Sequence, residues 1–143
     1  MSGASKPARR GRYYEDFTLG AVYKHWPGRT VYEGDNRFYC IMTMNHSYDE
    51  PVIHPGYLYS LLLGLSANDV TGNVVHHEEL RIRNIEDVQY GDTIYAETEV
   101  LVVEEIDNKP GRGLVVVETH GYTQDRVMFM SYQRRMGVRK RAT

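Results

Sequence analysis

The sequence predicts an α+β fold in which a long, curved antiparallel sheet wraps around one apolar helix. A length of 143 residues with 41% hydrophobic content fits a single soluble domain. Residues 56–69, GYLYSLLLGLSAND, are apolar on nearly every side, so a helix there must be buried by protein. After Gly72, four stretches alternate apolar and polar residues, with short turns between them. That pattern is typical of antiparallel strands.

The N-terminal part of the chain predicts a tail and a turn. Residues 1–12 are small, polar and basic, and we expect them to be disordered. One folded domain is expected to follow, over residues 13–143. It begins with YYEDFTLG, which is rich in turn formers and ends at Gly20.

Two elements are expected before the apolar helix. Residues 21–32 are strand-like but contain Pro27-Gly28, which predicts a bent strand at the edge of the sheet. Asp35 is a good N-cap residue and predicts the start of a short helix. The apolar residues that follow have the i, i+3, i+4 spacing of a helix: Phe38, Ile41 and Met42.

The apolar helix and the strands complete the predicted order. Pro55 suits the first position of a helix. The strands are expected within residues 74–85, 91–107, 114–124 and 126–138, with turns at NKPGRG and near Gln124-Asp125. Short connections predict that the four strands form a sequential antiparallel meander. Because such a sheet leaves edge strands to be covered, we expect a homodimer paired edge to edge.

Composition excludes several classes of protein. The net charge of -2 and the pI near 6.3 give no argument for a nucleic-acid or membrane partner. No apolar stretch approaches 18 residues and no secretory signal is visible, so we expect a cytoplasmic protein. Basic residues cluster in residues 6–12 and 133–141, which fits either solvated ends or contacts with the phosphates of a nucleotide-bearing substrate. Cys40 is the single cysteine and is expected to be a buried thiol.

Four segments, in order, resemble the hotdog-fold family of MaoC-like dehydratases and (R)-specific enoyl-CoA hydratases. They are GRYYEDFTLG, GRTVYEGDNRFYCIMTMN, PVIHPGYLYSLLLGLS and VQYGDTIYAETEVL. The opening is most similar to mesaconyl- and itaconyl-CoA hydratases. The resemblance implies a hydro-lyase that adds water to, or removes it from, an acyl-CoA or a carrier-bound acyl thioester. It implies no cofactor.

The chain departs from this family where the catalytic residues are expected. The family segment reads roughly Gly-Asp-x-Asn-Pro-x-His after the first helix, whereas here Asn45 stands in place of the Asp and His46 follows at once. Three explanations are open. The loop is short and keeps His46 as the family histidine; the chain has altered chemistry; or a loop is missing between Asn45 and His46 in the sequence as written.

Hydration of an unsaturated thioester needs an acid-base group and a donor to the thioester oxygen. The start of the buried helix predicts the donor, since the free N–H groups of Gly56 and Tyr57 would favour negative charge there. His46 is the candidate acid-base residue because an imidazole titrates near neutrality, and Asn45 could orient water. His54 is expected to cap the helix or to face the substrate.

Other reactive residues favour rival functions or none. HHEE at residues 76–79 places His76 with Glu78 and His77 with Glu79 on opposite faces of a strand, so we expect no metal site. A thioesterase would need Asp49 or Glu50 at the helix mouth. A non-catalytic hotdog protein that binds an acyl or polyketide-like ligand is the other alternative, which Asn45 favours. Arg135 and Lys140 are candidates for contacts with CoA phosphates.

Overall fold

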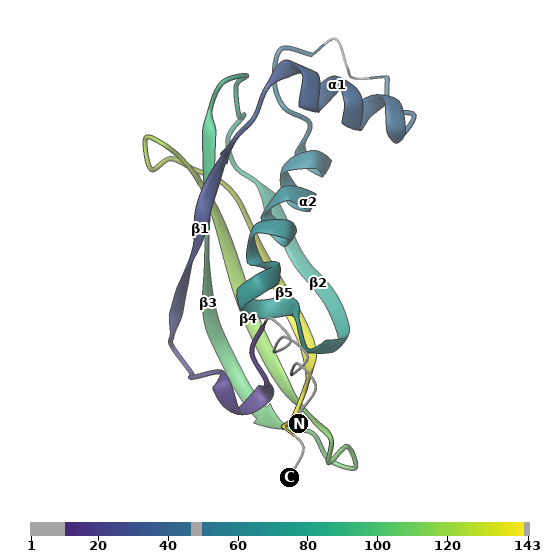
Figure 1. Ribbon diagram of the computed structural model, residues 1–143, viewed down its shortest axis with the longest axis vertical. Coiled ribbons are helices and arrows are strands. Elements are labelled where there is room, and N and C mark those ends of the chain that lie inside the picture. The colour runs from purple at the N-terminus through teal and green to yellow at the C-terminus, as the bar shows by residue number, and fades with distance from the viewer. Residues whose placement is uncertain (1–10, 47–49, 142–143) are drawn as a thin grey trace, which may run out of the picture.

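A computed structural model describes residues 11–46 and 50–141, which form one five-stranded sheet and a helix lying across it (Figure 1). This arrangement confirms the predicted α+β class. No helix among these residues is long and apolar enough to cross a membrane. The elements, in chain order, are η1 Tyr14–Asp16, β1 Val22–Thr30, α1 Glu33–Met42, α2 Pro55–Ser66, a π-helical turn η3 Ala67–Thr71, β2 Val74–Asn84, β3 Thr93–Glu105, β4 Arg112–Thr123 and β5 Met128–Arg139.

The strand order differs from the predicted meander. The order is β1-β3-β4-β5-β2, with every neighbouring pair antiparallel. The predicted meander is therefore correct for β3, β4 and β5, but wrong for β2, which pairs with β5 at the far edge. The connection over residues 85–92 joins β2 at one edge to β3 near the other edge, so it crosses the end of the sheet. It is anchored there by Val88. Val88 is fully buried and its carbonyl accepts a hydrogen bond from the Ile53 N–H at 2.9 Å.

The first strand is the bent edge strand that the sequence predicts. β1 pairs only with β3 in the sheet, and its register shifts between His25 and Arg29. The interruption contains the cis peptide bond between Trp26 and Pro27. Since a proline cannot donate a hydrogen bond, it is accommodated at the irregular part of an edge strand.

Helix α1 begins earlier than predicted and presents its apolar residues to solvent. Its N-cap is Tyr32, whose N–H donates to the Asp35 carboxylate at 2.9 Å. Asp35 therefore lies in the first turn and is not the N-cap. The buried side chains are Asn36 and Cys40. The residues whose spacing predicted the helix are exposed: Phe38, Ile41 and Met42.

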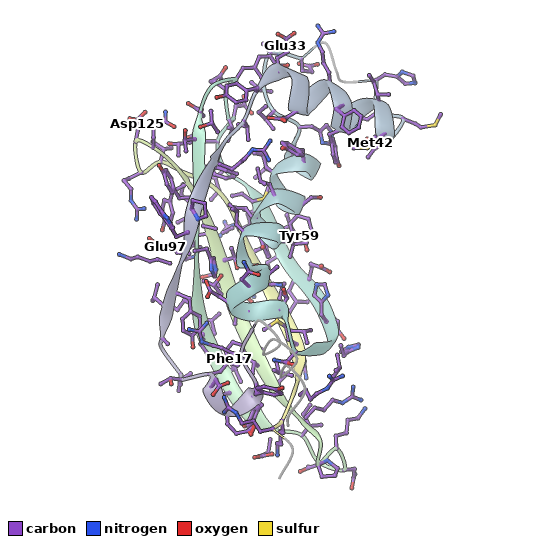
Figure 2. The ribbon with its side chains drawn as sticks, viewed as in Figure 1. Phe17, Glu33, Met42, Tyr59, Glu97 and Asp125 are labelled. Atoms are coloured by element: carbon purple, nitrogen blue, oxygen red, sulfur yellow. The ribbon has the colours of Figure 1, made fainter. Side chains whose placement is uncertain are left out.

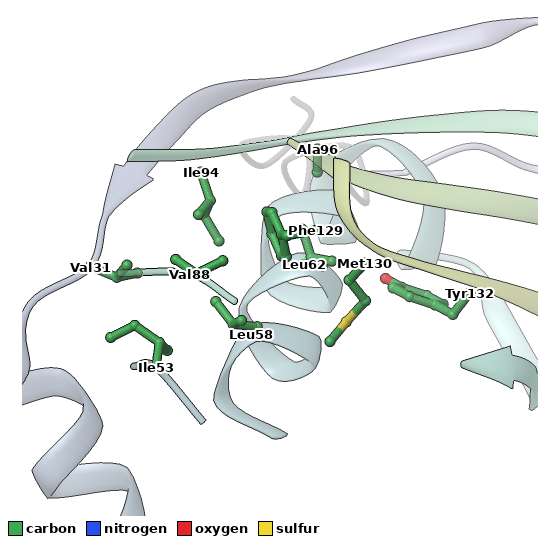
Figure 3. Packing of buried hydrophobic residues seen from close by; sticks show 10 residues of the cluster. All are labelled: Val31, Ile53, Leu58, Leu62, Val88, Ile94, Ala96, Phe129, Met130 and Tyr132. Carbon is green, nitrogen blue, oxygen red and sulfur yellow. The ribbon is translucent and has the colours of Figure 1, made fainter. Parts of the chain in front are cut away.

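Helix α2 and the concave face of the sheet form the main core. Leu58 and Leu62 of α2 pack against Ile94, Phe129 and Tyr132 of the sheet (Figure 3). The prediction that α2 is buried is met by its inner face, where Leu62 is fully buried. Of the basic residues assigned to the predicted tail, Arg12 lies against the fold. Its guanidinium stacks 3.7 Å from the centre of the Tyr23 ring. Residues 1–10 lie outside the described part.

A polar chain centred on the buried His25 ties β1 to η3, the turn that follows α2. His25 is 3% exposed, and its Nδ1 lies 2.8 Å from the Asp69 carboxylate. Its Nε2 lies 2.7 Å from the Thr98 hydroxyl, which in turn contacts Thr119 at 2.9 Å. Nδ1–H therefore donates to Asp69, and Nε2 accepts from Thr98. Burial lowers the pKa of His25, while the hydrogen bond to Asp69 opposes this shift.

We expect stability to fall as the pH drops below about 6.5, the ordinary pKa of histidine. Above that pH, His25 is neutral in both the folded and unfolded chains. Below it, the unfolded chain takes up a proton that the folded chain resists, because the folded pKa is lowered. Urea unfolding at pH 7 and pH 5.5 would measure the loss. His25→Gln should flatten this dependence, whereas His76→Gln, at an exposed position, should not. An unchanged slope in His25→Gln would contradict the assignment.

Candidate functional site

The start of α2 lies where α1, the following loop and the helix itself meet (Figure 1). We call this region, defined by Asn45, His54, Gly56 and Tyr39, the α2 mouth. α2 begins at Pro55, as the sequence predicts, with His54 as its N-cap. The buried side chain of Asn36 in α1 accepts a hydrogen bond from the His54 N–H at 2.7 Å. The first helix therefore fixes the backbone at the point where the second one starts.

The His54 ring makes two hydrogen bonds that determine its tautomer. The Gly56 N–H donates to Nδ1 at 3.0 Å, so Nδ1 carries a lone pair and no proton. A neutral ring then has its proton on Nε2, which lies 2.7 Å from the side-chain amide of Asn45. The structure sets Asn45 Nδ2 at this position. Because Nε2–H needs an acceptor, the contact becomes a hydrogen bond once the amide oxygen and nitrogen of Asn45 exchange places, an assignment that such networks decide. Asn45 thus holds His54 with a basic nitrogen facing Gly56.

The two N–H groups expected to be free at this helix start are both occupied. Gly56 N–H bonds to the His54 ring, and Tyr57 N–H donates to the His54 carbonyl at 3.0 Å. The prediction that these groups are free is wrong for this conformation. The reason is that a histidine at the N-cap can itself satisfy a donor of the first turn. The acceptor of the Gly56 N–H is a side chain, which a substrate oxygen can replace.

Aromatic rings enclose the mouth on the α1 side. The Tyr39 ring lies 5.5 Å from the His54 ring and 5.7 Å from the Tyr57 ring, between centroids. Burial raises the pKa of Tyr57. A Cβ atom on Gly56 would overlap the Tyr39 hydroxyl and lie 3.1 Å from His54 Nδ1. The close approach of Tyr39 therefore requires glycine at position 56.

Two hollows flank the mouth. One, of about 260 Å³, is lined by Glu50, Val52, His54 and Pro55. The other, of about 200 Å³, lies on the β2 side, and its lining is Ile53, Pro55, Leu58, residues 84–88 and Phe129. The His54 side chain and the backbone that follows it are therefore accessible beside open space that could hold a small acyl group.

The remaining candidates lie apart from this arrangement. His46 is exposed and lines neither hollow, so the structure brings Asn45 together with His54 and not with His46. No feature of the sequence indicated that His54 would be the partner of Asn45, since the contact joins residues from either side of a loop. Asp49 lies outside the described residues.

The charged residues elsewhere are paired or distant. His76 bonds to Glu78 at 3.3 Å, and His77 bonds to Glu79, so each pair shares one face of β2 as predicted. Lys140 forms an ion pair with Glu105. β5 ends near this pair, at the opposite end of the sheet from the α2 mouth (Figure 1). A role for Lys140 in binding CoA phosphates therefore finds no support in this geometry.

Comparison with known proteins places the chain in a family. Residues 4–143 match the family model described as mesaconyl-CoA hydratase. The curated mesaconyl-CoA hydratase of Cereibacter sphaeroides is 32% identical over 147 residues, which cover 93% of this chain and 43% of that protein. The chain thus spans less than half the length of this relative.

Solved structures agree on the fold. A protein of Chloroflexus aurantiacus described as a MaoC domain dehydratase superposes with a TM-score of 0.84 at 23% identity, covering 96% of this chain and 43% of that one. The MaoC-like dehydratase of Rhodospirillum rubrum gives 0.79 at 13% identity, covering 93% and 100%. A Mycobacterium tuberculosis protein described as having a double hotdog fold gives 0.75 at 23% identity, covering 92% and 45%. The chain has the hotdog fold and belongs to the mesaconyl-CoA hydratase family.

Proposed function

We propose that this chain builds a hydro-lyase site that adds water to, or removes it from, an acyl-CoA or carrier-bound acyl thioester. The observation that carries the proposal is the meeting of one basic nitrogen and one N–H donor at the mouth of a buried helix. His54 Nδ1 accepts a hydrogen bond of 3.0 Å from the Gly56 N–H, which sets the tautomer, and the Asn45 side chain contacts the other ring nitrogen. The family membership and the curated relative's name support the same chemistry.

Substrate binding would exchange the partners of that hydrogen bond. The thioester oxygen replaces His54 Nδ1 as acceptor of the Gly56 N–H, whose position in the first turn of α2 favours developing negative charge. His54 Nδ1 is then released to accept a proton from water. Asn45 keeps Nε2 protonated and the ring oriented, in the way that an asparagine orients the histidine of papain-like proteases.

The proton balance of hydration closes on the same residue. The water oxygen bonds to the β-carbon while His54 Nδ1 takes one water proton, and the C=C electron pair moves toward the thioester as an enolate. The Gly56 N–H stabilises the enolate oxygen. The imidazolium then returns its proton to the α-carbon. Dehydration is the reverse sequence, and neither direction needs a cofactor.

An assay with crotonyl-CoA and mesaconyl-CoA tests the proposal. The enoyl absorbance and the free thiol are followed together. Loss of absorbance without release of thiol is the expected result. Constant absorbance and thiol across a broad panel of acyl-CoA esters would contradict it and leave the ligand-binding alternative.

Thioester hydrolysis is the second candidate because one carboxylate borders the same hollow. Glu50 lines the 260 Å³ hollow together with His54. The Tyr90 hydroxyl donates to the Glu50 carbonyl at 2.5 Å and holds this part of the loop in place. Release of thiol that is abolished in Glu50→Gln would establish the thioesterase.

The exposed β2 edge supports the proposed homodimer. β2 pairs with β5 on one side only, and nearly all its residues are exposed. Leu80 and Ile82 are 37% and 49% exposed, which is unusual for an edge strand facing water. The double hotdog of the M. tuberculosis relative supports pairing with a second unit.

We expect Ile82→Lys to convert the dimer to a monomer, because a charge on the β2 edge disfavours pairing with a second copy. Light scattering coupled to gel filtration would measure the mass. Leu19→Lys, at a residue that is 66% exposed and distant from β2 in sequence, serves as the control and should remain dimeric. A wild-type chain that is monomeric at micromolar concentration would refute the dimer.

A cytoplasmic location stays a prediction, which cell fractionation would test.

A further inference from the structure

Four cationic side chains gather around the turn between β3 and β4. Lys109 lies in this turn, Arg112 begins β4, and Arg135 and Arg139 belong to β5. Among the residues that the structure describes, none of the four forms an ion pair. This end of the sheet therefore carries an excess of positive charge, although the chain as a whole has a net charge of -2.

The arginines lie on the face of the sheet that α2 does not cover. Met136 and Val138 of β5 are fully buried in the core. Because successive residues of a strand point to opposite faces, Arg135 and Arg139 lie on the outer face. Arg112 is directly opposite Arg139 in the β4–β5 register, and residues opposite each other share a face. The three guanidinium groups are thus on one side of the sheet.

Two adjoining hollows are lined by these side chains. The first, of about 320 Å³, has Lys109, Arg112 and Arg135 in its lining. The second, of about 380 Å³, has Lys109, Arg112 and Arg139. Four positions separate the two β5 arginines, which is about 13 Å along a strand. We call the two hollows, joined through the side chains that they share, the cationic recess.

The recess contains too few acidic groups to balance its charge. Of the described residues, Glu78 is the one carboxylate in the lining, and it bonds to His76 at 3.3 Å. Four cations and one carboxylate leave three positive charges. Lys140 lies near the same turn, but it pairs with Glu105. Since like charges at close range repel each other, this arrangement favours a bound anion and does not by itself stabilise the fold.

The anion that matches the recess is a chain of phosphates. Arginine binds phosphate oxygens through its planar fork of N–H groups, and lysine binds them as a point charge. Two or three linked phosphates carry about three or four negative charges near neutral pH. A carboxylate or a single phosphate would balance fewer charges and would reach only one end of the recess. The half-buried side chains of Ile106 and Leu114 add an apolar surface for an organic part of the ligand.

The recess is remote from the α2 mouth. Figure 1 shows the turn between β3 and β4 at the opposite end of the sheet from the start of α2. Figure 2 labels Phe17 toward the recess end, and Glu33, the first residue of α1, at the other end. The recess also opens on the outer face of the sheet, whereas α2 lies on the inner face. A ligand bound here therefore leaves the place of the thioester free.

We propose that the cationic recess binds a polyphosphate chain, either inorganic or part of a nucleoside triphosphate, as a ligand distinct from the acyl thioester. Lys109 and Arg112, which line both hollows, contact the middle of the chain. Arg135 and Arg139 contact its two ends. Binding needs no turnover, so the inference does not depend on the proposed function.

Calorimetric titration with tripolyphosphate at low ionic strength tests the proposal. Arg112→Gln should weaken Kd about 10-fold or more, the effect of losing a hydrogen bond to a charged group. Arg112→Lys, which keeps the charge without the fork, should weaken it less. Lys24→Gln removes one positive charge from an exposed position of β1 and should leave Kd unchanged. Equal Kd values in the wild type and Arg112→Gln, or no binding at millimolar tripolyphosphate, would overturn the inference.

Thermal unfolding without ligand separates lost binding from a damaged fold. Arg112 forms no ion pair with the described residues, so Arg112→Gln should unfold at the wild-type temperature. Should it not fold, Arg139→Gln takes its place, at an exposed position on the neighbouring strand. Tripolyphosphate binding that Arg139→Gln leaves at full strength would then overturn the inference.

Two further ligands decide whose phosphates enter the recess. ATP should bind as well, and Arg112→Gln should weaken its binding too. Tighter binding of ATP than of tripolyphosphate would assign the recess to a nucleotide, and equal binding would assign it to the inorganic chain. Saturating CoA should leave the Kd of tripolyphosphate unchanged. Displacement of tripolyphosphate by CoA would show that the recess serves the thioester substrate and would overturn a separate site.

Discussion

Gly56→Ala should lose activity by about 100-fold to 1,000-fold, the effect of removing one donor to a developing oxyanion. The added methyl group would overlap the Tyr39 hydroxyl and crowd His54 Nδ1. Either the tyrosine or the helix start must then move, and the N–H would no longer point to the position of the thioester oxygen. The value of kcat/KM for the hydration of crotonyl-CoA measures the loss.

Gly64→Ala provides the control on the same helix. A Cβ atom there would meet nothing within 4 Å, and the residue is exposed. Alanine is a better helix former than glycine by about 1 kcal/mol, so this variant should be slightly more stable and fully active. Full activity in Gly56→Ala as well would mean that the thioester oxygen is bound elsewhere, and the assignment of the α2 mouth would be abandoned.

The fold was predictable where the signal is local. The apolar residues of α2, the proline at its start and the turn between β4 and β5 each indicate their structure within a few positions. The place of β2 was not predictable, because its partner β5 is some 50 positions away in the chain and the connection is anchored by the single buried residue Val88. Alternation identifies a strand but does not identify its neighbour.

The sequence indicated a location for the candidate site, and this location stays a prediction; the contacts within it were not predictable. A helix start with a glycine indicated where a thioester oxygen could be held. The pairing of Asn45 with His54 depends on how the loop closes, and no periodicity encodes that. The burial of Arg134 was missed for a related reason: in sequence it lies in a basic run with Arg135, and only the alternation of faces in β5 separates a buried residue from an exposed one.

His54→Ala should reduce hydratase activity by about 100-fold to 10,000-fold, the usual contribution of a positioned acid-base group. His46→Ala, which removes an exposed imidazole eight residues away, should retain activity if the α2 mouth is the site. The pair therefore decides between the histidine indicated by the family segment and the one that the structure places against Asn45. Loss in His46→Ala with full activity in His54→Ala would reverse the assignment.

His54 is also an N-cap, so lost activity alone could reflect a damaged helix start. His54→Asn separates the two roles, because asparagine is a good N-cap residue but cannot carry a proton between water and carbon. It should unfold at nearly the wild-type temperature and remain inactive. Asn45→Ala should fold and lose about 10-fold or more, since the ring keeps its base but loses the partner that holds its tautomer. An active His54→Asn would show that capping, and not proton transfer, is the function of this side chain.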